Sequence, residues 1–131
     1  MEAQAAPVIG PVDIATLNHH GNRNSQCPSY VRTIRPRVWV MQNWTSDHPG
    51  DGVLRRLTSQ KLYPGPRDIY ATSILDATKN VIGSLVEKTI MPKTGHIVIR
   101  VYPGGSSYKM FVLDDNSDEY DIILQNDYIS R

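Results

Sequence analysis

The stretch that decides the fold is VWVMQNW, residues Val38–Trp44, which is the strongest strand signal in the chain. On its N-terminal side, the apolar and β-branched run VDIATLN predicts a strand over Val12–Asn18. Pro28 is well placed as the first residue of a short helix between these strands. That helix ends near Pro36, because the residue before a proline avoids the α region. The order strand, helix, strand makes the two strands parallel neighbours.

On its C-terminal side, the central strand is followed by alternating helices and strands and then by a hairpin. A polar loop leads to a helix that Asp51 can cap. Gly83 lowers the stability of the helix predicted over Thr78–Ile90 by about 1 kcal/mol. The predicted elements are a helix beginning near Asp51, a strand over Asp68–Ser73, a helix over Thr78–Ile90, hairpin strands over His96–Tyr102 and Tyr108–Leu113, and a third strand over Tyr120–Leu124. This order predicts an α/β fold, with a mixed sheet, helices on at least one face and a closing β-hairpin.

Composition limits the functional classes. A chain of 131 residues is one domain or part of one. Its 14 Lys and Arg against 13 Asp and Glu leave no global basic field for nucleic acid. The single cysteine, Cys27, excludes an internal disulfide framework and a Cys-rich zinc module. No apolar run approaches the roughly 18 residues of a membrane span, and the first ten residues lack the basic region and long apolar core expected of a secretory signal. The compartment stays unknown, with a cytoplasmic location as the default expectation.

Two histidine-containing loops follow the two strongest strands. His19 and His20 come just after the first strand, and His48 follows the second. Loops at the carboxyl ends of parallel strands converge, so Asn43, Trp44 and His48 are expected to wall one cleft with the first loop. The side chains of adjacent residues in an extended chain point to opposite sides. At most one of His19 and His20 therefore faces this cleft, unless the loop turns between them. From spacing alone, the plainer interpretation is a pair of surface or packing histidines beside an ordinary polar loop.

No complete catalytic motif stands in the sequence. A catalytic zinc normally takes three protein ligands plus water. The four histidines show no H-x-x-x-H or H-x-H spacing, and Cys27 has no C-x-x-C partner. The acidic segment 114–119 lacks the glycine and the glutamate of a calcium loop. There is no G-x-S-x-G elbow, Walker loop or G-x-G-x-x-G.

Four segments together nevertheless resemble a known family. They are VDIATLNHHGNRNS, RPRVWVMQNW, DHPGDGVLRRL and TGHIVIRVYPGG, within roughly residues 10 to 113. In this order they resemble the C-terminal part of metallo-β-lactamase-fold hydrolases. The branch they resemble most is the nuclease-like domain of bacterial competence (DNA-uptake) proteins, which shows a strand, HHGS, a helix, a GHP loop, a second helix and a closing hairpin.

The resemblance implies a fold, a chemistry and site residues. The fold would be a four-layer αββα sandwich whose two metal ions, usually zinc, activate a hydroxide for phosphodiester or ester hydrolysis. The last histidine ligand of the family matches His19 or His20. His48 matches the GHP histidine, with Asp47 in place of glycine. Asn22 stands where the branch has serine. The expected substrate-facing or ligand-supporting residues are Asn22, Ser25, Asn43 and His48.

The sequence departs from the family because H-x-H-x-D-H, which supplies most ligands, is absent from the 131 residues. The chain is therefore expected to be a single incomplete domain, with residues 1–11 as a lead-in and 114–131 as a tail. Its partner would be the missing N-terminal half, without which it would neither hold zinc tightly nor catalyse hydrolysis. An exposed apolar face is expected to cause self-association. The face would comprise Val38, Val40, Ile97, Ile99 and Val101.

Two alternatives remain open. The first is a non-catalytic binding or interaction module that keeps half of the fold. The second is a nucleic-acid-binding domain that binds through a surface of basic residues. Solvated helix faces explain these basic residues equally well. That surface would use Arg32, Arg35, Arg37, Arg55 and Arg56.

Overall fold

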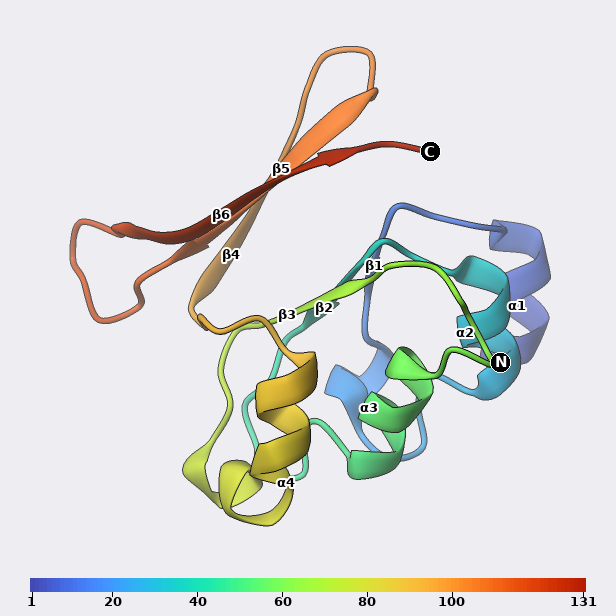
Figure 1. Ribbon diagram of the computed structural model, residues 1–131, viewed down its shortest axis with the longest axis horizontal. Helices are drawn as coiled ribbons and strands as arrows, with labels where there is room; N and C mark the ends of the chain where they lie inside the picture. The colour runs from blue at the N-terminus through green and yellow to red at the C-terminus, as the bar shows by residue number, and fades with distance from the viewer.

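The computed structural model describes all 131 residues as two three-stranded sheets with helices on one side (Figure 1). The elements are α1 (Glu2–Ile9), β1 (Ile14–Thr16), a short helical turn (Asn18–Gly21), α2 (Pro28–Ile34), β2 (Val38–Met41), α3 (Asp51–Thr58), β3 (Asp68–Ala71), α4 (Asp76–Thr89), β4 (His96–Val101), β5 (Ser107–Leu113) and β6 (Ile122–Ile129). The protein is thus mixed α/β, as the sequence predicts.

The first sheet is parallel, in the order β1-β2-β3. Val38 of β2 aligns with Ile14 on one side and with Asp68 on the other. The prediction that the first two strands are parallel neighbours is therefore confirmed. It follows that the loops after these strands meet at one end of the sheet.

The second sheet is antiparallel, in the order β4-β5-β6. The predicted hairpin is confirmed by the pairing of β4 with β5, and the predicted third strand by the pairing of β6 with β5. The expectation of one mixed sheet is wrong, because these strands do not join the edge of β1 or β3. They lie over the face of the parallel sheet instead, where both sheets bury large apolar side chains. The buried residues between them are Val38, Val40, Tyr70, Tyr108, Met110, Val112 and Tyr128.

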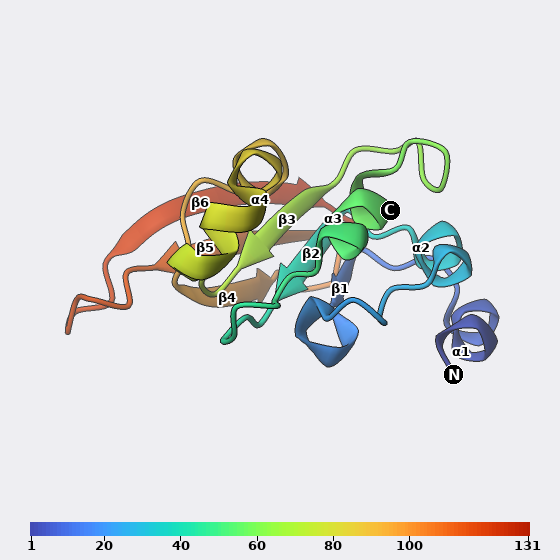
Figure 2. The same ribbon diagram turned by 90° about the horizontal axis from the view of Figure 1, so that it is seen from below.

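The opposite face of the parallel sheet packs against the helices. Trp39 and Met41 of β2, with Ile69 of β3, point into this second core and are fully buried. Figure 2 looks onto this helical side, with α3 and α4 in front of the strands. The parallel sheet is therefore the middle layer, with the helices on one face and the antiparallel sheet on the other (Figure 1).

Both ends of the chain are more ordered than a lead-in and a tail. Residues 1–11 contain α1, whose Glu2 carboxylate accepts hydrogen bonds from the backbone N–H groups of Gln26 (2.9 Å) and Cys27 (2.6 Å). Sequence periodicity misses this helix, because its tie to the start of α2 is a long-range contact. Residues 114–131 contain β6. Neither terminal segment is a free extension.

The exposed apolar face is smaller than predicted. Val38 and Val40 are buried, so that part of the prediction is wrong, because the antiparallel sheet covers β2. Ile99 and Val101 of β4 are 40% and 61% exposed, so the prediction is confirmed at this edge strand. No helix is long and apolar enough to cross a membrane.

Candidate functional site

The two predicted loops meet at the carboxyl end of the parallel sheet. The helical turn Asn18–Gly21 follows β1, and the segment containing His48 connects β2 to α3. The backbone N–H of Gly50 donates to the carbonyl of Gly21 at 2.9 Å, which joins the loops directly. Helix α3 begins at Asp51, and its N-cap residue is Gly50. The prediction that Asp51 caps this helix is therefore wrong, since no side chain makes a capping hydrogen bond here.

The chain turns sharply at the histidine pair. His19, His20 and Gly21 have φ angles of 48°, 55° and 80°, which all lie in the left-handed region. Gly21 suits this turn, since a Cβ there would lie 2.8 Å from the side chain of Leu17. Left-handed residues with side chains are strained and recur at functional sites. The turn carries the two imidazoles to different places.

His20 lies in a cluster of three aromatic rings. Its ring stacks on the ring of His48, with centroids 5.1 Å apart and planes 25° apart. Trp44 stands nearly perpendicular to both, at 6.2 Å from His20 and 6.1 Å from His48. The structure thus unites His20 with His48 and with Trp44, which the sequence placed on a shared cleft wall.

The hydrogen bonding of His20 fixes which ring nitrogen is available. Its Nδ1 lies 2.8 Å from the backbone carbonyl oxygen of Gln42. A carbonyl only accepts, so Nδ1 carries the proton and the neutral ring keeps its lone pair on Nε2. This arrangement is typical of histidines that bind metals or accept protons. The role of Gln42 escapes sequence reasoning, because its backbone and not its side chain makes the bond.

His48 is the buried member of the cluster, at 4% exposure. Its Nδ1 has no hydrogen-bond partner, and its Nε2 lies 3.9 Å from Oδ1 of Asp47. Burial lowers the pKa of His48; the neighbouring His20 and His19 lower this pKa further, while the Asp47 carboxylate raises it. The ring therefore favours its neutral form.

Polar neighbours hold the second loop in place. Nδ2 of Asn22 donates to Oδ2 of Asp47 at 2.9 Å, and the Thr45 hydroxyl donates to the other carboxylate oxygen. The Thr45 hydrogen bond lowers the pKa of Asp47. Asn43 is buried, and its Nδ2 donates to the carbonyl of His48 at 3.4 Å. Asn22 and Asn43 thus act on the loop that carries His48.

Two predicted site residues lie outside the ring cluster. His19 borders a separate cavity of about 420 Å³, together with Glu2 and Cys27. The Ser25 side chain is buried, with its hydroxyl 2.6 Å from the carbonyl oxygen of Asn22. This hydroxyl stabilises the loop after the histidine pair and does not face the rings. Between the two histidines, the geometry favours His20 as the available ligand.

Most of the arginines proposed for nucleic acid are occupied within the chain. Arg37 pairs with Asp68 at 3.0 Å, and Arg55 pairs with Asp51 at 3.0 Å. Arg56 donates to three backbone carbonyls, those of Arg23, Ser25 and Gln26. Arg37 and Arg56 are partly buried and tie distant segments together, whereas Arg32, Arg35 and Arg55 are exposed, and of these three only Arg55 pairs with a carboxylate.

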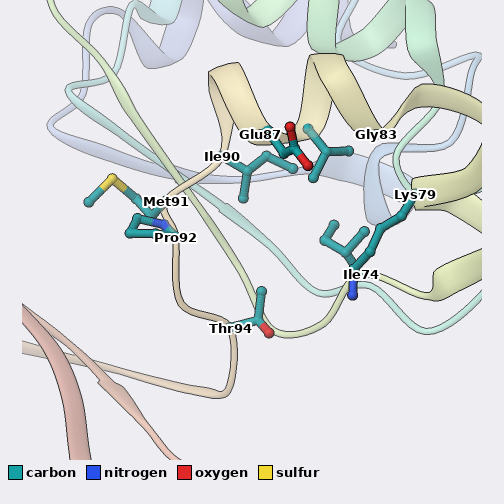
Figure 3. Close-up of a pocket in the computed structure, with 9 residues that line it drawn as sticks. Ile74, Lys79, Gly83, Glu87, Ile90, Met91, Pro92 and Thr94 are labelled. Carbon is teal, nitrogen blue, oxygen red and sulfur yellow. The ribbon is translucent and has the colours of Figure 1, made fainter.

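Two cavities flank the parallel sheet. One, of about 330 Å³, borders the His48 loop and is lined in part by Arg23, Asp47 and Thr78. Another, of about 410 Å³, lies between α4 and the segment leading to β4, with Lys79 and Glu87 among its walls (Figure 3). The second cavity contains none of the candidate site residues.

The cluster does not form a complete metal site. No group of three or more His, Cys, Asp or Glu side chains is arranged to hold a metal ion. Comparison of the chain with protein-family models, with curated proteins and with solved structures found no match.

Proposed function

We propose that this chain is the C-terminal part of a metal-dependent hydrolase of the metallo-β-lactamase fold, active on phosphodiesters or esters. One observation carries the proposal. His20 has its Nδ1 proton bound to the carbonyl of Gln42, which leaves Nε2 as a free lone pair where two loops converge.

The order of layers supports the proposal. Helices, a parallel sheet and an antiparallel sheet form three successive layers. An αββα sandwich contains this same succession and adds a second helical layer over the outer sheet. A complementary half would supply that layer together with the H-x-H-x-D-H ligands.

The donors of this chain fit one side of a metal centre. A catalytic zinc needs three protein ligands and an open position for water. His20 offers one imidazole nitrogen, and its neighbours do not complete a set of three metal ligands. When bound, zinc would lower the pKa of its water and so supply a hydroxide nucleophile. The 131-residue chain alone should bind zinc weakly and lack hydrolytic activity.

His48 is assigned a positioning role. Its buried ring stacks on His20 and limits the orientations open to that imidazole. Asn22 acts one step further out, because it holds Asp47 beside His48. These residues would keep Nε2 of His20 aimed at one point, which a metal ligand requires.

A zinc titration of the isolated chain tests the role of His20. We expect weak binding that shifts the His20 ring signals in nuclear magnetic resonance spectra and is lost in His20→Ala. His96→Ala is the matched control, because His96 is an exposed histidine that lies beside Tyr120 on the antiparallel sheet, away from His20. Zinc binding that survives His20→Ala, or that depends on His96, would contradict the assignment.

Reconstitution tests the hydrolase. Joining an N-terminal half that bears H-x-H-x-D-H should give stoichiometric zinc by atomic spectroscopy and turnover of a bis-aryl phosphodiester. His20→Ala should reduce both, whereas His19→Ala should leave metal content unchanged. Stoichiometric zinc with zinc-dependent turnover in the 131-residue chain alone would show that no second half is needed.

A non-catalytic interaction module is the second candidate, favoured by the open edge of β4. Tyr102 donates its backbone N–H to Ser107 of β5, so by strand alternation the backbone groups of Ile99 and Val101 point to the unpaired edge. Both side chains are also exposed. Such an edge is open to pairing with another strand.

Sedimentation velocity tests this second candidate. If the edge associates, Val101→Lys should shift the chain towards monomer, because a charge at an edge strand opposes pairing. Val81→Lys serves as the control, since Val81 is 83% exposed on α4, away from the β4 edge. A monomer with unchanged sedimentation in both variants would remove the edge as an interaction site.

A further inference from the structure

Trp44 is the most exposed aromatic side chain near the proposed site. It is 67% exposed, whereas the other tryptophan, Trp39, is fully buried in the helical core. An indole is large and apolar, so leaving it in water forgoes a substantial gain from burial. The fold places this residue at the end of β2 without covering it.

The neighbours of Trp44 define where its open surface lies. Its ring is nearly perpendicular to the rings of His20 and His48, at similar distances from both. Both histidine rings pack beside the indole, and its 67% exposure leaves part of an indole face open to a ligand. A second ring stacked on that face would lie next to His20.

We propose that Trp44 is a stacking platform for an aromatic ring carried by the substrate. This inference deepens the proposed function, on which it rests, by naming the substrate class: phosphoesters that bear an aryl group or a nucleobase, in preference to alkyl or sugar phosphates. Stacking is favourable for any planar ring, since each has a π-face, and it requires no specific hydrogen bonds.

The polar surroundings agree with a ring that arrives attached to a phosphate. Because Nδ1 of His20 is bonded to the Gln42 carbonyl, Nε2 is the ring nitrogen left for a metal or for a proton-bearing group. A phosphoester next to it would place its ring within reach of Trp44. Trp44 would then set substrate preference, and His20 would serve the reacting end.

Fluorescence of the metal-free 131-residue chain tests the platform. Trp39 is shielded, so quenching by a small ligand reports on Trp44. Adenosine monophosphate and phenyl phosphate should quench, whereas ribose 5-phosphate and methyl phosphate should not. Quenching by both ring-bearing probes indicates a general aromatic platform, and quenching by the nucleotide alone indicates a nucleobase site; both support the inference. Equal binding of the sugar phosphate, or no quenching by any probe, would overturn it.

Variants separate stacking from structure. By nuclear magnetic resonance titration, Trp44→Leu should weaken adenosine monophosphate binding about tenfold, while Trp44→Phe should retain most of it. Tyr120→Leu is the matched control, because Tyr120 is a 55%-exposed aromatic residue packed against His96. Equal losses in Trp44→Leu and Tyr120→Leu would overturn the inference.

The outcome is independent of the zinc experiment. His20→Ala should abolish zinc binding and should weaken the quenching of Trp44 without abolishing it, because His48 still packs beside the indole. Loss of zinc binding with retained quenching therefore fits both proposals. Zinc binding that persists in His20→Ala would refute the metal ligand alone, and absent quenching would refute the platform alone.

Discussion

Two polar clusters at opposite ends of the parallel sheet are built in contrasting ways. At the carboxyl end, His20, Trp44 and His48 form a ring cluster that includes an unpartnered buried nitrogen and an exposed indole. At the amino end, a network of side chains joins the two sheets. Its members are Arg37, Asp68, Tyr70, Asn126 and Tyr128.

In the second cluster, the polar side chains form hydrogen bonds and an ion pair with one another. The Tyr128 hydroxyl donates to Asp68 at 2.6 Å and lies 2.8 Å from the Tyr70 hydroxyl. Asn126 donates to Tyr70 at 2.7 Å, and Arg37 pairs with Asp68 at 3.0 Å. The amino-end cluster therefore stabilises the packing of the two sheets, whereas the carboxyl-end cluster keeps groups that are available to a ligand.

The largest expected effect follows from Asp68→Ala. This change leaves the partly buried guanidinium of Arg37 and the hydroxyl of Tyr128 without their acceptor. We expect the free energy of unfolding to fall by about 3 kcal/mol in urea denaturation. Asp51→Ala is the control, because Asp51 and Arg55 form an exposed pair within α3. Equal losses in both variants would mean that the tyrosine network contributes no special stability.

Alkaline pH should destabilise the packing between the two sheets, where Tyr108 and Tyr128 are both buried. Burial, and to a smaller degree the charge of Asp13, raises the pKa of Tyr108 from 10.0 to about 12. Burial also raises the pKa of Tyr128, and its hydrogen bonds to Asp68 and Tyr70 add to this rise. The folded state favours the neutral phenols, so their contribution is complete below pH 10 and is lost as the pH rises towards 12. For Tyr108 alone this loss amounts to about 2–3 kcal/mol.

Ultraviolet titration of phenolate formation, combined with circular dichroism, checks this pH dependence. Ionisation of the buried tyrosines should coincide with loss of structure. Tyr108→Phe should retain more stability than the wild type near pH 12. Complete ionisation of all seven tyrosines near pH 10 in folded protein would be inconsistent with the sheet packing.

A smaller effect is expected for Tyr128→Phe. This change keeps the ring that stacks on Tyr108 at 5.1 Å and removes only the hydroxyl that joins Asp68 to Tyr70. The expected loss is about 1–2 kcal/mol by urea denaturation. Tyr102→Phe, at a half-exposed position beyond β4, should change stability by less than about 0.5 kcal/mol. A neutral Tyr128→Phe would show that the ring alone maintains the sheet packing.

The smallest stability effect should come from the carboxyl-end cluster. Trp44→Leu removes an exposed side chain, so the free energy of unfolding should change by about 0.5 kcal/mol or less. The same variant is expected to lose ring binding, so stability and ligand binding should separate at this position. A loss of several kcal/mol in thermal or urea unfolding would instead make Trp44 a structural residue.

Local sequence patterns are enough to predict most of the strands and helices, and the end of the parallel sheet where the candidate residues gather. Apolar runs predicted β1, β2 and the β4–β5 hairpin, and the order strand, helix, strand predicted the parallel pair. Because parallel strands end at the same edge, the sequence predicts that one of His19 and His20 lies close to His48, and in the structure His20 stacks on it. The contact follows from chain order and handedness, which are local properties.

The way the two sheets meet, and which polar groups stay without a partner, depends on long-range packing. Tyr70 and Tyr128 are 58 residues apart in sequence, and no local pattern predicts that they touch or that the second sheet covers Val38. The left-handed turn and the carbonyl of Gln42 placed His20, and not His19, in the ring cluster. These outcomes depend on packing between distant segments and on backbone hydrogen bonds, which side-chain identity alone does not encode.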